Sequence, residues 1–299
     1  MKIYILLFFV MVFWGFNLSA VKVLVSSIDP ILLTAVRIFV AGISVLVIAY
    51  FLNVFRLPTR KELKTIIFIG IFNVIIHHTI LSLGIHYTSG VNSGLILGTG
   101  PLLTVILSII FLKDRVTRLR VLGFILGFVG IGITTVGAGD GFSALSMGDL
   151  FVFIAILSQA ISFILISKLN PDFDPRLLTG YMLVIGSFFI FVTSLFMKKD
   201  LGQLSYLFSW KLGLVFLFSA VACTAFGHMT YNYAIKQVGP VESAIFVNLN
   251  TFFSILGVAL FLGEPVYMNH IGGMLLILIG VFIGSGAMDY LLRKRRSVN

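Results

Sequence analysis

The chain has 299 residues, of which 59% are hydrophobic and 11% charged, and this balance is too apolar for a soluble domain of ordinary composition. The formal net charge of +10 does not indicate a nucleic-acid-binding protein, because the lysines and arginines follow apolar runs instead of forming one basic surface. The composition therefore predicts an integral membrane protein that lies in a lipid bilayer and has no nucleic-acid partner.

Ten apolar runs have about the length of a transmembrane helix, since a hydrocarbon core of ~30 Å needs about 20 apolar residues. Charged residues, prolines or glycines separate the runs, and the connections are too short to contain a soluble domain. The predicted spans are 3–22, 31–52, 65–86, 90–112, 119–137, 148–168, 176–197, 211–235, 241–262 and 268–290. The expected fold class is an all-α integral membrane protein with ten transmembrane helices.

Residues 78–133 recur at 228–283 without a gap, so the chain contains an internal duplication. The recurrence includes paired glycines and an acidic residue that ends one apolar run in each copy, which chance identities among apolar residues do not explain. Asp29-Pro30 and Asp174-Pro175 continue the match upstream, at an offset five residues shorter. Each copy therefore contains five spans.

An odd number of spans in each copy predicts that the two copies have opposite orientations in the membrane. We divide the chain into a first five-helix repeat at 1–140 and a second, inverted repeat at 141–299. Inverted repeats are frequent in secondary transporters, because two similar halves can exchange conformations. Basic residues gather after the second, fourth and tenth spans, so the positive-inside rule predicts a multi-pass protein of a prokaryotic cytoplasmic (inner) membrane with both termini in the cytoplasm.

The first span carries Trp14 and Asn17 on one helical face. A packed or lipid-facing aromatic is an equally good interpretation of Trp14, whereas Asn17 should face a polar partner or water, because an unpaired amide in hydrocarbon costs a few kcal/mol. Gln159 in the sixth span aligns with Trp14 in the duplication. These three residues are candidates for a solute-binding pocket.

Lys22 and Arg37 are expected at the outer ends of the first two spans. Snorkelling, or pairing with a carboxylate such as Glu242 or Glu264, is the favoured interpretation of both residues, and anion binding is the alternative.

His78 in the third span and His228 in the eighth are equivalent positions of the duplication, and they are the strongest candidates for a site. Thr224, His228 and Asn232 follow one another at intervals of four, as one polar stripe on a helix. The two imidazoles should flank one cavity near the middle of the membrane. Hydrogen bonding between packed helices is the alternative role for each histidine.

The fourth and ninth spans are candidates for a gate. Pro101 removes a backbone hydrogen bond in mid-span and predicts a kink, and Thr251 is its equivalent in the second copy. Asn248 and Asn250 precede Thr251 and suit the carboxylate, amine or amide of a zwitterionic solute, although hydrogen bonding between helices is a serious alternative.

Glycines four residues apart in the fifth and tenth spans predict close helix packing, and a homodimer through these Gly-rich faces is a further option. They are Gly123, Gly127, Gly280 and Gly284.

All eleven acidic residues are expected at span ends or in loops, so no carboxylate is available in mid-membrane for proton exchange. Coupling, if there is any, would fall to His78 or His228, and otherwise the protein is a facilitator. The chain has no phosphate-binding loop, zinc-binding HExxH pair or nucleophile elbow, so no catalytic residue, metal or cofactor is expected.

The order of several short motifs within two five-helix copies resembles the EamA family of the drug/metabolite transporter superfamily. The motifs are Trp14-Gly15, Lys22, Arg37 seven residues after Pro30, Pro101, Phe111–Asp114 and Phe261–Glu264. The sequence departs from the family pattern at Lys113, Asp114, Ser158-Gln159 and Thr251. The resemblance implies a ten-helix exporter or uniporter of small metabolites, commonly amino acids or their analogues.

These features predict an alternating-access carrier, not an enzyme, that moves a small polar or zwitterionic metabolite outward. The alternatives are a membrane enzyme or lipid-handling protein that uses its intramembrane histidines, and a receptor that does not transport. The predicted substrate-binding residues are Trp14, Asn17, His78, Gln159, His228, Asn232, Asn248 and Asn250. The predicted gating residues are Pro101 and Thr251.

Overall fold

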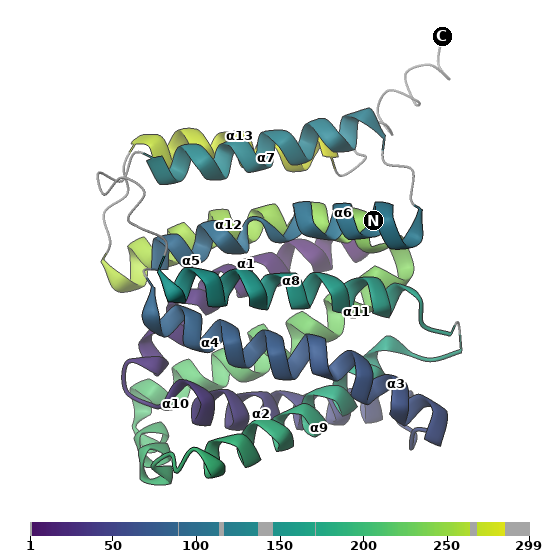
Figure 1. The fold of residues 1–299 in the computed structure, drawn as a ribbon, viewed down its shortest axis with the longest axis vertical. Helices are drawn as coiled ribbons and strands as arrows, with labels where there is room; N and C mark the ends of the chain where they lie inside the picture. The colour runs from purple at the N-terminus through teal and green to yellow at the C-terminus, as the bar shows by residue number, and fades with distance from the viewer. Residues whose placement is uncertain are drawn as a thin grey trace.

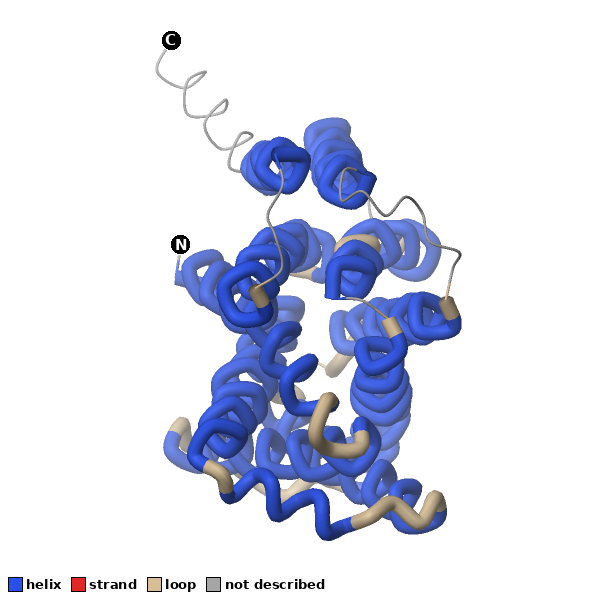
Figure 2. The backbone as a smooth tube through the Cα atoms, turned by 90° about the vertical axis from the view of Figure 1, so that its left-hand side faces the viewer, coloured by secondary structure: helices blue, strands red, loops and turns tan. Residues whose placement is uncertain are grey.

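The computed structural model describes residues 2–88, 90–113, 117–136, 146–170, 172–263 and 268–284, and every regular element within these ranges is a helix. The helices lie side by side, as Figure 1 shows from the side and Figure 2 shows nearly end-on. One pair of helices lies at one end of the stack and another pair at the opposite end. They are α7 (Arg118–Val136) with α13 (Met268–Gly284), and α2 (Pro30–Phe51) with α9 (Pro175–Phe196).

The remaining helices lie between these two pairs or flank the second one (Figure 1). In the first half they are α1 (Lys2–Val25), α3 (Arg60–Gly70), η1 (Ile71–Ile76), α4 (His77–Tyr87), α5 (Gly90–Leu97) and α6 (Gly100–Leu112). In the second half they are α8 (Met147–Ser167), η2 (Leu201–Phe208), α10 (Trp210–Leu217), η3 (Phe218–Phe226), α11 (Gly227–Val238) and α12 (Pro240–Leu262).

Seven helices in the described ranges are long and apolar enough to cross a membrane, and three further apolar helices are shorter. Two of the seven are composite, because α3, η1 and α4 join into Arg60–Tyr87, and α10, η3 and α11 join into Trp210–Val238. The predicted all-α membrane architecture is therefore confirmed. The number of ten crossings and the inversion of the two halves stay predictions.

The repeated Asp-Pro dipeptides begin two equivalent helices. The Asp29 carboxylate accepts hydrogen bonds from the backbone N–H groups of Ile31 and Leu32, at 3.0 and 3.2 Å, and so caps α2. Asp174 caps α9 in the same way by accepting from the N–H of Arg176 at 2.8 Å. A side-chain acceptor at the N-cap satisfies N–H groups that have no partner within the helix, and proline suits the first helical position.

We expect Asp29→Ala to lower the free energy of unfolding by about 1 kcal/mol, because the helix loses its cap. The Asp29 carboxylate also pairs with the Lys199 ammonium at 2.8 Å, and a partly exposed pair of this kind contributes ~0–1 kcal/mol. Asp29→Asn is the matched control, since its amide oxygen can still cap the helix. Thermal unfolding of detergent-solubilised protein measures both variants, and an equal loss in Asp29→Asn would show that the cap is not the cause.

Two π-helical segments precede the predicted site histidines. Segment η1 ends just before His77, and η3 ends just before Gly227, the residue equivalent to His77 in the duplication. At both junctions the N–H group bonds three residues back, from His77 to Val74 and from Gly227 to Thr224. Short π-helical stretches often mark functional sites, because they rotate the following side chains relative to an ordinary helix. Neither segment was predicted from the sequence.

Glycines bring α7 and α13 together within one chain. A Cβ atom added to Gly130 would lie 2.6 Å from the carbonyl oxygen of Gly273, and one added to Gly280 would lie 2.6 Å from that of Gly123. The predicted close helix packing therefore occurs inside the protein. A dimer through these glycines would compete with this contact, and dimerisation itself stays a prediction.

Candidate functional site

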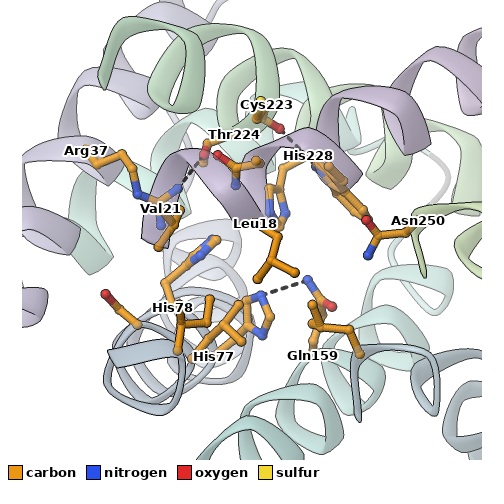
Figure 3. A pocket seen from close by; sticks show the side chains of 16 residues that line it. Leu18, Val21, Arg37, His77, His78, Gln159, Cys223, Thr224, His228 and Asn250 are labelled. Carbon is orange, nitrogen blue, oxygen red and sulfur yellow. Dashed lines mark hydrogen bonds between the residues drawn. The ribbon is translucent and has the colours of Figure 1, made fainter. Parts of the chain in front are cut away.

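A cavity of about 70 Å³ lies between helices from both halves of the chain, and Figure 3 shows the side chains around it. Six of the eight predicted substrate-binding residues line it. They are Trp14, Asn17, His78, Gln159, His228 and Asn250.

Three histidine rings meet at the cavity. The ring centroids of His78 and His228 are 4.9 Å apart, and the ring of His77 lies 4.7 Å from that of His78. The Nε2 atom of His78 and the Nδ1 atom of His228 are buried and have no hydrogen-bond partner among the described residues. These two nitrogens therefore keep unused hydrogen-bonding capacity beside the cavity.

His77, which was not among the predicted site residues, has a hydrogen-bond partner at each of its ring nitrogens. Its Nδ1 atom lies 3.0 Å from the carbonyl oxygen of Ala155, and its Nε2 atom lies 3.0 Å from the amide nitrogen of Gln159. A carbonyl oxygen only accepts, so the Nδ1–H group donates to Ala155 and Nε2 accepts from the amide. These bonds fix the tautomer of His77 and hold Gln159 against the cavity.

The side chain of Trp14, which belongs to the first half of the chain, contacts residues of the second half. Its indole N–H donates to the carbonyl oxygen of Cys223 at 2.9 Å, and its ring lies 5.0 Å from that of His228. The N–H of Gly227 bonds to Thr224 instead of to Cys223, so the π-helical segment leaves this carbonyl free of its ordinary i+4 bond. The helix irregularity thus creates the acceptor that positions the indole.

Arg37 lies inside the cavity, where only 4% of the residue is exposed. Its Nη1 atom donates to the hydroxyl oxygen of Thr224 at 2.7 Å, and its Nε atom is buried without a partner in the described structure. The expected snorkelling of Arg37 is therefore wrong, because α2 directs the side chain inward. Lys22 donates to the carbonyl oxygens of Ile85 and Thr88, at 2.9 and 2.6 Å, and so caps the end of α4.

Two predicted residues, Asn232 and Asn248, do not line the cavity in the described structure. Asn232 donates to the hydroxyl of Thr179 at 2.9 Å and so connects α11 to α9. Asn248 faces α7, where a Cβ added to Gly127 would lie 2.7 Å from its Nδ2 atom. Asn248 and Asn250 are two residues apart on one helix, about 200° around its axis, so they point in nearly opposite directions.

The helix is interrupted next to one predicted gating residue, Pro101, and is continuous through the other, Thr251. The helix around Pro101 is broken, since α5 ends at Leu97 and α6 begins at Gly100. The equivalent Thr251 lies within the continuous helix α12, and its hydroxyl oxygen is 3.5 Å from the carbonyl oxygen of Gly94. The kink predicted from Pro101 is present, and its role as a gate stays a prediction.

Within the described ranges, no carboxylate lines the cavity. Asp149 is the buried acidic residue of the described ranges, and it lies outside the cavity, at the start of α8, where it forms a capping box with Ser146. It also accepts a hydrogen bond from the Thr88 hydroxyl at 2.6 Å. The charge within the cavity is therefore set by Arg37.

Known proteins match the chain over nearly its whole length. A model of the EamA-like transporter family matches residues 1–136 and 146–285. The uncharacterized transporter YyaM of Bacillus subtilis (strain 168) is 30% identical, and the alignment covers 96% of this chain and 95% of that protein. An uncharacterized transporter of Archaeoglobus fulgidus is 26% identical, with 95% and 98% covered.

A solved crystal structure has the same fold, with a TM-score of 0.77 at 14% sequence identity. The superposition covers 97% of this chain and 98% of that one. At this identity the likeness concerns the fold alone.

Proposed function

Because this chain belongs to the EamA-like transporter family, we propose that it is a secondary transporter that exports a small polar or zwitterionic metabolite, such as an amino acid or an analogue. It is a multi-pass membrane protein related to transporters. In this proposal it lies in the cytoplasmic membrane of a prokaryote, with both termini in the cytoplasm. The observation that carries the proposal is the cavity with polar side chains from both halves of the chain. In each half, a π-helical segment at an equivalent position directly precedes a histidine region that lines the cavity.

The proposed architecture is ten crossings in two inverted repeats. Helix contacts support it, because exchanging the two halves converts many of these contacts into other contacts that are also present. Helix α1 packs against α12 and η3, and its equivalent α8 packs against α6 and η1. The contacts of α2 with α9 and of α7 with α13 each join two equivalent helices. A pseudo-two-fold axis would produce this pattern.

In the proposed mechanism, the two halves rock around the cavity and open it to one side of the membrane at a time. The helix is interrupted between α5 and α6 in one half and is continuous as α12 in the other, so the halves are not in the same conformation. Exchange of these conformations would move the opening to the opposite face. Leu18 points into the middle of the cavity (Figure 3) and would have to move as the cavity widens.

Flux in liposomes tests the proposed function directly. Purified protein is reconstituted into liposomes that contain a defined mixture of amino acids and related metabolites, and the external solution is analysed by mass spectrometry over time. We expect selective, unmodified release compared with protein-free liposomes. Conversion of a compound would indicate a membrane enzyme, and binding without release would indicate a receptor. A dependence of flux on an imposed pH gradient separates histidine-linked coupling from a facilitator.

We expect Pro101→Ala to slow flux several-fold without lowering the thermal stability. Alanine restores a backbone N–H that can donate to the carbonyl of Leu97, so α5 and α6 can join into one stiffer helix. The matched control is Ile110→Ala, because Ile110 is an exposed residue of the same helix α6. Flux and thermal unfolding are measured for both variants. Unchanged flux in Pro101→Ala would remove the kink from the transport cycle.

A further inference from the structure

We propose that Arg37 binds a carboxylate group of the transported solute. This inference rests on the proposed function and names the solute class and the residue that recognises it. Helix α2 carries the guanidinium into the cavity, where it lies between Thr224 and His78 (Figure 3).

The hydrogen-bonding capacity of Arg37 is largely unused. A guanidinium has five N–H donors and keeps its positive charge in proteins. The structure gives it one hydrogen bond, from Nη1 to the Thr224 hydroxyl, and its Nε–H is buried without an acceptor in the described residues. A buried charge is very unfavourable unless an opposite charge and further hydrogen bonds compensate it.

The described part of the chain supplies no such compensating charge. The described ion pairs join Arg56 to Glu62, Arg176 to Asp174 and Lys199 to Asp29, all away from the cavity. The polar groups that line the cavity around Arg37 are hydroxyls, amides, the Cys223 thiol, the Trp14 indole and the three imidazoles, and none of these is a carboxylate. The missing negative charge can come from the solute.

The position equivalent to Arg37 shows that packing does not require a charge there. At the offset that aligns the two Asp-Pro dipeptides, Arg37 corresponds to Met182, which is fully buried in the apolar core. Replacing a buried charge with an apolar side chain is often neutral or stabilising. An arginine in one half only is therefore consistent with a role in binding.

The chemistry of the cavity favours a carboxylate over a phosphate group. The planar fork of a guanidinium matches the two oxygens of a carboxylate, which can accept two parallel N–H bonds. One permanent positive charge balances one carboxylate, whereas a phosphate dianion would keep an excess charge in a buried place. The unpartnered nitrogens of His78 and His228 can hydrogen-bond a polar substituent near the carboxylate.

The intrinsic fluorescence of Trp14 provides a binding assay. The chain has two tryptophans, and Trp210 is 82% exposed, so Trp210→Phe leaves Trp14 as a single reporter beside the cavity. This protein is titrated in detergent with acetate, lactate and benzoate, and with the matched amides acetamide, lactamide and benzamide, at constant ionic strength. We expect a saturable change with at least one acid and a binding at least about tenfold weaker for its amide, because the charge-assisted bonds are lost.

Substitutions at Arg37 complete the test. Arg37→Met copies the residue of the equivalent position and should abolish acid binding, and Arg37→Lys, which keeps the charge but not the fork, should weaken it about tenfold. Arg56→Lys is the matched control, since Arg56 lies outside the cavity and pairs with Glu62, and it should bind as the parent does. Thermal unfolding establishes that each variant is folded. If Arg37→Met does not fold, Arg37→Lys and the comparison of acids with amides decide.

Three results would overturn the inference: no acid binds, an amide binds as well as its acid, or folded variants of Arg37 keep the parent affinity. Tighter binding of inorganic phosphate than of any carboxylate would overturn the assignment of a carboxylate. The proposed function fails separately, if acids bind through Arg37 while liposomes release no metabolite. Release that is unaffected in Arg37→Met would leave the proposed function intact and reject the role of Arg37.

Discussion

Replacing His228 by Ala should reduce solute flux to the background of protein-free liposomes while the protein stays folded. The imidazole lies between the rings of Trp14 and His78, at 5.0 and 4.9 Å, so its removal opens the centre of the cavity and takes away a polar contact. Its buried Nδ1 atom has no partner in the described structure, so the substitution breaks no hydrogen bond at that atom. Flux is measured in liposomes, and folding is measured by thermal unfolding and size-exclusion chromatography.

His86→Ala is the matched control for this variant. His86 is exposed at the end of α4 and contacts the ring of Tyr87 edge-to-face, away from the cavity. We expect it to keep the parent flux. If His228→Ala keeps the parent flux together with its pH dependence, His228 does not belong to the site.

We expect Gly15→Val to lower the stability of the folded protein, which is the second large effect. A Cβ atom at Gly15 would lie 2.7 Å from the carbonyl carbon of Phe253 and 2.8 Å from the backbone nitrogen of Ser254. These are backbone atoms of α12 and cannot rotate away, so α1 and α12 must separate. Overpacking of this kind costs about 1–3 kcal/mol, and a branched side chain should reach the upper end of that range. The melting temperature of the detergent-solubilised protein measures the loss.

Gly94→Ala is the control in the same region. An added Cβ there would meet only Leu18 and Ser254 side-chain atoms, at 3.8 and 3.9 Å, which is ordinary contact. Alanine is also favoured over glycine within a helix by about 1 kcal/mol. We therefore expect Gly94→Ala to be as stable as the parent protein or more stable. An equal loss of stability in both variants would show that close approach of α1 and α12 is not the cause.

Helix positions could be predicted from the sequence, because they depend on local signals. The predicted spans 31–52 and 176–197 begin just after the Asp29-Pro30 and Asp174-Pro175 dipeptides, and the structure places N-caps at the two aspartates. Pro101 marked a helix break, which lies between α5 and α6. The other helices were predicted from the lengths of the apolar runs, because the hydrophobic thickness of a bilayer sets the length of a transmembrane helix.

The candidate site was predicted only in part, because the direction of a side chain depends on the exact winding of its helix. The π-helical segments change that winding before His77 and Gly227. No pattern of residues predicted these segments. His77 was missed because its equivalent in the duplication is Gly227, so no second histidine marked it. The equivalence of His78 and His228 in the duplication was the useful signal, and both line the cavity.

The role of Arg37 required knowledge of its neighbours. From the sequence, a basic residue near a span end suggested snorkelling, whereas the structure turns it toward Thr224. The polarity of Asn232 and Asn248 suggested a solute site, but Asn232 serves the contact of α11 with α9. An amide within a membrane helix satisfies its hydrogen bonds equally well in either role.

The cavity should open to each side of the membrane in turn, and the single cysteine of the chain can test this alternation. Cys223 lines the cavity and is buried in the present conformation. A small membrane-impermeant thiol reagent is applied to right-side-out and to inside-out vesicles, with Cys223→Ser as the unlabelled control. We expect labelling of Cys223 from both faces. Alternating access is wrong if Cys223 is labelled from one face only, or from neither.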